Sequence, residues 1–248
     1  MSAQFSVLPS PAALAAAAAD RVVASARNAI RRRGRCVLAL SGGSTPRLVY
    51  PLLASSPRID LVDWSRVDFF WGDERGVPAD HPDSNFGLAR RLLLDQLPEV
   101  RREAVHPMPA DAAEPEAAAE RYEATIGRVL GVRPGSTRRP RFDLVWLGMG
   151  PDGHTASLFP DAAALSERRR WVMPATAPKT SLVPSRMTVT LPLINAARTV
   201  LFVVAGTDKA GAVRAVRSGS SDLPAARVRA RSTVWLLDAA AAGETARR

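Results

Sequence analysis

A histidine and an aspartate stand in one glycine-rich turn, and their spacing suits acid–base chemistry. The turn reads Gly148-Met149-Gly150-Pro151-Asp152-Gly153-His154 and directly follows the apolar run 142–147, which predicts a buried strand. An imidazole can take a proton from water near neutral pH, and a neighbouring carboxylate can hold it in the required orientation. We therefore predict that His154 is a general base and that Asp152 orients it.

The same turn also fits the pattern Gly-x-Gly-x-x-Gly, which follows a strand in dinucleotide-binding proteins. A pyrophosphate site presents bare backbone N–H groups, whereas this turn carries a carboxylate and an imidazole. Such sites also place an acidic residue about twenty positions later, and the stretch 171–174 has none. These two observations favour catalysis over nicotinamide binding, which stays as the alternative interpretation.

A second segment, Ser41-Gly42-Gly43-Ser44-Thr45, follows the apolar run 36–40 and has the features of an anion site. Its two glycines let the backbone approach a ligand closely, and its hydroxyls can donate hydrogen bonds. Pro46 suits the first turn of a helix whose N-terminus would point at the same anion. The segment lacks the Gly-Lys-Ser/Thr ending of a P-loop, so a nucleoside triphosphate is not favoured. A plain Gly-Ser turn is the alternative.

A third segment, Gly72-Asp73-Glu74-Arg75, follows the aromatic strand predicted at 67–71. A structural ion pair is the alternative to a functional role for any of its charged residues. Two adjacent carboxylates could bind a metal ion, but no cluster of histidines or cysteines accompanies them. His81 and His106 lie in proline-flanked loops, and we expect both at the surface.

Apolar runs alternate with helical patterns along the chain, which predicts a mostly parallel α/β sheet with helices on both faces. We expect a single domain over 1–248, because no linker or repeat divides the sequence. In open parallel sheets ligands bind beyond the carboxyl ends of the strands, so the three segments above should meet there. Strands are predicted at 36–40, 67–71, around 105, 142–147, 187–191, 200–205 and 233–237, and helices at 11–33, 46–53, 86–97, 115–130 and 208–216.

Composition excludes several classes of protein. The formal net charge is +10, but 32 of the 34 basic residues are arginines, scattered in short clusters beside helix ends and loops where solvated arginine is expected. With no RNP-like motif, zinc-finger spacing or basic heptad helix, we expect no nucleic-acid partner. No apolar run is long enough for a membrane span, and the N-terminus is unlike a signal peptide. A single cysteine, Cys36, fits a cytoplasmic protein.

Four motifs together carry a resemblance that covers almost the whole chain in order: Ser41 to Pro46, Trp71 to Arg75, Asp83-Ser84-Asn85 and Gly148 to Pro160. They are similar to those of the 6-phosphogluconolactonases, in the glucosamine-6-phosphate isomerase/6-phosphogluconolactonase superfamily. After the Asp-Gly-His turn, the related deaminases continue with an Ile-Ala-Phe-Asn-Glu-Pro type of sequence, which this chain lacks. Arg75 also stands where deaminases usually carry an aromatic residue.

The resemblance implies a modified Rossmann-like fold of the sugar-phosphate isomerase/lactonase type. The expected reaction is hydrolysis of 6-phospho-D-glucono-1,5-lactone to 6-phospho-D-gluconate in the pentose phosphate pathway, without metal or cofactor. His154 and Asp152 would activate water, and Arg75 would face the developing oxyanion. Residues expected to bind the substrate and its phosphate are Gly42, Gly43, Ser44, Thr45, Asp73, Asn85, Arg186 and Lys209.

A sugar-phosphate isomerase or deaminase of the glucosamine-6-phosphate type is the main alternative, and a non-catalytic sugar-phosphate sensor is another. The only partner expected is the small sugar-phosphate lactone. Oligomeric state is left open, with a monomer plausible. The roles of Glu74 and Lys179 are also open, as is whether Arg75 faces the carbonyl or the phosphate.

Overall fold

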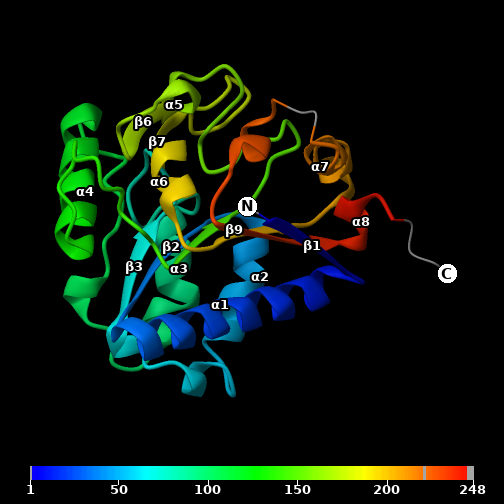
Figure 1. Ribbon diagram of the computed structural model, residues 1–248, viewed down its shortest axis with the longest axis horizontal. Coiled ribbons are helices and arrows are strands. Elements are labelled where there is room, and N and C mark those ends of the chain that lie inside the picture. Colours follow the sequence, from blue (N-terminus) through cyan, green and yellow to red (C-terminus); the bar gives the residue numbers. More distant parts are fainter. Residues whose placement is uncertain (1, 220–221, 245–248) are drawn as a thin grey trace.

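The computed structural model describes residues 2–219 and 222–244, and these form two sheets (Figure 1). The larger is a six-stranded parallel sheet in the order β1-β9-β8-β5-β2-β3. The predicted parallel α/β fold is therefore confirmed, although the edge strand β1 was not anticipated. The strands are β1 (Ser2–Leu8), β2 (Cys36–Leu40), β3 (Val67–Trp71), β5 (Leu144–Leu147), β8 (Val200–Val204) and β9 (Ser232–Asp238).

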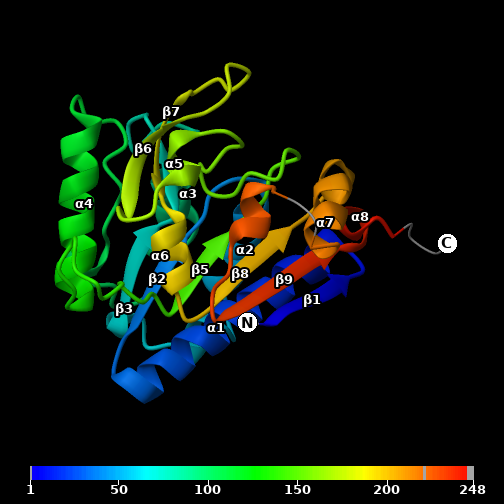
Figure 2. The same ribbon diagram turned by 45° about the horizontal axis from the view of Figure 1, so that its top comes forward.

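The central strands are covered on both faces, which explains why they appear in the sequence as unbroken apolar runs. Every residue of β2, β5 and β8 is buried. Helices α1 (Pro11–Arg33) and α2 (Ser44–Leu53) cover one face, and α6 (Leu191–Ala196) lies on the opposite face (Figures 1 and 2).

The ends of α1 follow from local sequence. The Ser10 hydroxyl accepts a hydrogen bond from the backbone N–H of Ala13 at 3.2 Å, and Pro11 occupies the first turn. Gly34 ends the helix at φ 76°, a left-handed conformation that glycine adopts without steric cost. Both predicted boundaries of this helix are therefore confirmed. The other α-helices are α3 (Asn85–Leu92), α4 (Pro115–Leu130), α5 (Ala163–Ser166), α7 (Ala210–Arg217) and α8 (Ala239–Ala242).

A smaller antiparallel sheet, in the order β4-β7-β6, stands at the carboxyl end of β3. The Gly72 N–H donates to the Leu40 carbonyl in the large sheet, and the Gly72 carbonyl accepts from Val189 in the small one. The strand expected at 187–191 was thus placed wrongly among the parallel strands, because its periodicity does not reveal its partner. The strands are β4 (Asp73–Arg75), β6 (Val172–Thr176) and β7 (Ser185–Val189).

Two other expectations need correction. The helix predicted over 86–97 stops at Leu92 and gives way to a 3-10 turn, and the strand expected around 105 is a single bridge to Phe69. The 3-10 helices are Ile59–Leu61, Trp64–Arg66, Leu94–Gln96, Arg102–Ala104, Thr207–Lys209 and Pro224–Arg227.

His106 was expected at the surface, and that prediction is wrong. The side chain is buried, and its ring stacks on Phe70 with 4.3 Å between centroids. Its Nε2 lies 3.4 Å from Oδ1 of Asp68, and its backbone N–H donates to the Phe69 carbonyl. The flanking proline correctly indicated a loop, but this loop runs along β3 rather than into solvent.

Within the described part of the chain, none of the helices combines the length and the apolar character that crossing a bilayer would require.

Candidate active site

The three predicted segments meet at the carboxyl ends of adjacent strands. The turn 148–154 follows β5, the loop 41–45 follows β2, and the segment 72–75 follows β3, while β5, β2 and β3 are neighbours in the sheet. A cavity of about 450 Å³ opens beside two of these segments. It is lined by Asp73, Arg75, Pro151, Asp152, His154, Ala156, Ser157, Phe159, Ala177, Pro178, Thr180, Ser181 and Arg186.

The imidazole of His154 lines this cavity and is held by Asp152 and Phe159. Its Nδ1 lies 2.6 Å from Oδ1 of Asp152, and the same carboxylate oxygen accepts the His154 backbone N–H at 3.1 Å. The ring of Phe159 packs against the imidazole with 4.6 Å between centroids. None of the described residues hydrogen-bonds to Nε2, and 30% of the side chain is exposed, so this nitrogen is available to a ligand or water.

Two glycines of the turn are required by its geometry. A Cβ at Gly150 would lie 2.2 Å from the imidazole ring and 2.7 Å from Oδ1 of Asp152. Gly153 has φ 76°, which favours glycine. Gly150 therefore allows the close packing of Asp152 against His154, and Gly153 allows the backbone conformation of the turn.

Asp73 links the turn to the neighbouring strands. Its Oδ2 accepts a hydrogen bond from the Ser157 hydroxyl at 2.7 Å, and its Oδ1 accepts one from the Asn85 amide at 3.3 Å. The Ser157 N–H donates in turn to the Thr188 hydroxyl of β7. Because all four residues are buried, this network holds together the small sheet, the start of α3 and the segment that follows the turn 148–154.

Glu74, whose role was open, points away from the cavity and caps α3. Its Oε1 accepts hydrogen bonds from the backbone N–H groups of Arg75 and Asn85. Its Oε2 accepts hydrogen bonds from the backbone N–H of Phe86 and from the Ser84 hydroxyl. Burial raises the pKa of this carboxyl above its ordinary value, and the backbone donors offset part of that effect. Glu74 therefore supports the site without lining it.

Arg75 and Arg186 lie on adjacent strands and both line the cavity. Arg75 Nη1 donates to the Asp83 carbonyl at 2.9 Å, and Arg186 Nη2 donates to the Ser181 hydroxyl at 2.9 Å. Burial, with the adjacent charge of Arg75, lowers the pKa of Arg186. Two cations therefore share this wall, and among the described residues their hydrogen-bond acceptors are a carbonyl and a hydroxyl, which carry no net charge.

The remaining candidates do not line the cavity. A Cβ at Gly42 would lie 1.7 Å from Oδ1 of Asn85, so the loop 42–45 packs directly on the residue that holds Asp73. Gly43 and Ser44 are exposed at the N-terminus of α2. Lys209 is paired with its neighbour Asp208 and does not line the cavity. Thr45 likewise lies outside the lining.

Sequence reasoning missed four residues of this site. Ser157 and Phe159 lie inside the quoted motif 148–160, but residue type alone did not mark them. Thr188 and Ser181 come from β7 and the loop before it. They could not be anticipated because the pairing of β4 with β7 was not predicted.

Comparisons with known proteins agree with this geometry. The family described as glucosamine-6-phosphate isomerases/6-phosphogluconolactonase matches residues 9–235. The chain belongs to this family. The 6-phosphogluconolactonase of Nostoc sp. is 40% identical over 242 residues, covering 96% of each chain. That of Mycobacterium leprae is 39% identical, covering 98% of this chain and 99% of its own.

Solved structures place the fold in the same family. The 6-phosphogluconolactonase from Trypanosoma cruzi superposes with a TM-score of 0.86 at 31% identity, covering 98% of this chain and 96% of its own. A monomeric glucosamine-6-phosphate deaminase superposes with a TM-score of 0.81 at 20% identity, which shows a shared fold alone.

Proposed function

We propose that this protein hydrolyses 6-phospho-D-glucono-1,5-lactone to 6-phospho-D-gluconate, with His154 as the general base. The observation that carries the proposal is one cavity with an oriented imidazole on one wall and two arginines on another. The lactonase names of relatives about 40% identical over most of the chain support the substrate. The base activates water, and the arginines match the negative charges of the substrate and the transition state.

Asp152 determines which imidazole nitrogen is basic. An ionised carboxylate only accepts hydrogen bonds, so Nδ1, at 2.6 Å, carries the proton. Nε2 is then the nitrogen with a free lone pair, and none of the described residues hydrogen-bonds to it. Asp152 also stabilises the imidazolium that forms when Nε2 takes a proton.

The reaction then follows in two steps. Nε2 takes a proton from water as the water oxygen attacks the lactone carbonyl carbon, and the carbonyl electron pair moves onto its oxygen. The tetrahedral intermediate collapses when that pair re-forms the carbonyl and the bond to the ring oxygen breaks. His154 returns its proton to the departing ring oxygen, so the imidazole ends neutral and the product is an open-chain acid.

The two arginines are assigned different parts of the substrate. Arg75 is the candidate for the oxyanion, where a cation in a partly dehydrated site stabilises developing charge. Arg186 is assigned to the 6-phosphate, because a guanidinium can donate two parallel hydrogen bonds to phosphate oxygens. The loop 42–45 and Lys209 are assigned to the same phosphate, and Asp73 and Asn85 to the sugar.

The direct test is hydrolysis of freshly prepared 6-phosphogluconolactone by the purified protein, corrected for spontaneous opening of the lactone. We expect turnover well above the uncatalysed rate and no ammonia from glucosamine 6-phosphate. Ammonia release without lactone hydrolysis would replace the proposal with deamination. Binding of the sugar phosphate without either reaction would indicate a sensor.

A further inference from the structure

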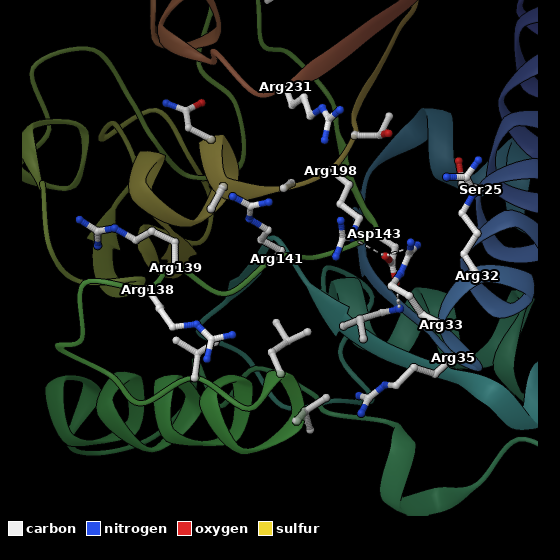
Figure 3. Close-up of a pocket in the computed structure, with 18 of the residues that line it drawn as sticks. Ser25, Arg32, Arg33, Arg35, Arg138, Arg139, Arg141, Asp143, Arg198 and Arg231 are labelled. Carbon is white, nitrogen blue, oxygen red and sulfur yellow. Dashed lines mark hydrogen bonds and ion pairs between the residues drawn. The ribbon is translucent and has the colours of Figure 1, made fainter.

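A second cavity, of about 970 Å³, lies at the opposite edge of the large sheet from His154. Its lining includes residues just before the amino ends of β2, β5, β8 and β9, together with parts of α1, the end of α4 and the loop 137–141. Figure 3 shows that its labelled residues are almost all arginines. The cavity is therefore separate from the catalytic site and has a marked excess of positive charge.

The charge balance of this lining is strongly one-sided. Eight arginines line the cavity, and Asp143 is the only acidic residue among its lining residues. They belong to clusters far apart in the sequence, at 32–35, 138–141, 198 and 231. Most of these arginines are exposed, as expected for solvated side chains, but the fold brings their separate clusters around one cavity.

The carboxylates in and beside this cavity, those of Asp143 and Asp68, already form ion pairs with arginines. Arg33 donates to Asp143 at 2.7 Å, and Nε of Arg198 lies 3.3 Å from the same oxygen (Figure 3). The other oxygen of Asp143 accepts the Val37 N–H at 2.9 Å. Arg35 pairs with Asp68, outside the cavity. Asp143 therefore neutralises little of the charge that surrounds it.

The remaining five arginines have no acidic partner in the described structure. Arg32 donates to the Asn28 side chain, and Arg139 donates to two backbone carbonyls. Arg138, Arg141 and Arg231 are exposed and make no side-chain hydrogen bond or ion pair with any described residue. Like charges held together in this way repel one another, and a bound anion would offset that repulsion.

We propose that this cavity binds a small ligand that carries several phosphate groups. Guanidinium groups pair with phosphate oxygens through two parallel hydrogen bonds, and several arginines around a cavity can hold several phosphates at once. The volume is at the upper end of the range for small-molecule sites. No aromatic side chain lines the cavity, which disfavours single-stranded nucleic acid, whose bases need stacking partners.

Titration calorimetry with inorganic tripolyphosphate tests the proposal, with ATP and inorganic phosphate as comparisons. We expect one tripolyphosphate per chain, bound at least about tenfold more tightly than phosphate because it reaches more arginines. Saturating 6-phosphogluconate should leave this binding intact, since the product occupies the opposite edge of the sheet. Tighter binding of ATP than of tripolyphosphate would identify a nucleotide, and equal binding would identify the phosphate chain alone as the recognised group.

Charge-reversal variants localise the binding. Arg141→Glu and Arg231→Glu should each weaken tripolyphosphate binding about tenfold or more, without lowering the melting temperature, because both side chains are exposed and unpaired. Arg121→Glu, at an exposed position of α4 outside the lining, makes the same change in net charge and should leave binding within about twofold.

Three results would overturn the proposal. Equal weakening by Arg121→Glu would mean attraction by net charge alone. Competition by 6-phosphogluconate would place the ligand in the catalytic cavity. Duplex DNA that bound more tightly than tripolyphosphate, and lost affinity in Arg141→Glu, would make this face a nucleic-acid surface instead.

Discussion

Arg75 and Arg186 stand directly opposite each other in the antiparallel pair of β4 and β7, and both face the cavity that His154 lines. Like charges in opposed positions destabilise a pair of strands. Burial and the neighbouring Arg75 charge lower the pKa of Arg186, so holding both cations there has a cost. An anionic substrate offsets this repulsion, which is why the pair is central to the predictions on specificity.

Replacing Arg186 with alanine should impair use of the phosphorylated lactone mainly through KM. Contacts to a group that does not react are made equally in the ground and transition states. A charge-assisted hydrogen bond contributes about 1.5–3 kcal/mol, which predicts a loss in kcat/KM of about ten- to a hundredfold. Steady-state kinetics of Arg186→Ala and Lys209→Ala would measure this loss.

Unphosphorylated gluconolactone is the control substrate for Arg186→Ala and Lys209→Ala. It has no group for a phosphate-binding cation to hold, so its kcat/KM should change little. Equal losses on both lactones would show that the cation acts at the carbonyl. An effect of Arg186→Ala alone would confine the phosphate to the cavity and exclude Lys209, which does not line it.

Loss of the base should remove most of the rate. His154→Ala is expected to lower kcat by about 10²–10⁴-fold, the usual contribution of a general base, with the fold intact. Asp152→Asn should also lower kcat, because the amide no longer stabilises the imidazolium. Circular dichroism checks the fold, and a loss below about threefold in His154→Ala would refute its assignment as the base.

Two glycines of the turn 148–154 make a matched pair for substitution. In Gly150→Ala, the added methyl would lie 2.2 Å from the imidazole, so the ring must move and kcat should fall. In Gly148→Ala, the methyl meets no atom within 4 Å, and activity should stay close to that of the parent protein. Similar activities for the two variants would mean that the position of His154 is not critical to the rate.

Glu74 should matter for stability rather than chemistry. In Glu74→Gln, an NH2 group replaces one accepting oxygen and faces backbone donors, so the free energy of unfolding should fall by about 1–3 kcal/mol at neutral pH. Denaturant unfolding measures this change. KM for the lactone should stay within about twofold, because Glu74 does not line the cavity.

The difference in the free energy of unfolding between the parent protein and Glu74→Gln should depend on pH. Because burial raises the folded pKa of Glu74, the native state retains its proton at a pH where the unfolded chain has lost it. The proton-linked part of the stability from this group is fully present below the unfolded pKa and is lost as pH rises through the folded pKa, whereas the hydrogen bonds to the backbone donors remain. The advantage of the parent protein over Glu74→Gln should therefore shrink as pH rises from about 4.5. Unfolding curves at several acidic pH values test the sign.

Activity should survive dialysis against EDTA. A lactone is an activated ester, and the proposed base needs no metal-bound water. Within the described residues, histidines, cysteines and carboxylates do not gather into a group of three or more suited to a metal ion. A loss of activity that a divalent cation restored would require Asp73 to be reconsidered as a ligand.

Much of this protein could be predicted from local sequence. Ser10, Pro11 and Gly34 set the ends of the first helix, and unbroken apolar runs marked the central strands because both faces of a parallel sheet are buried. The turn 148–154 was recognised as the catalytic candidate because its aspartate, glycines and histidine act on one another within seven residues. Interactions of this range depend on neighbours along the chain, so their pattern is visible in the sequence.

The features that local sequence did not predict depend on contacts between segments that are distant along the chain. The opposition of Arg75 and Arg186, the Ser157–Asp73 hydrogen bond and the burial of His106 each join residues separated by tens of positions or more. The arginine cavity likewise gathers clusters that lie up to about 200 residues apart. Such pairings depend on which strands become neighbours and in what register, and periodicity reports which face of a strand is buried but not what packs against it.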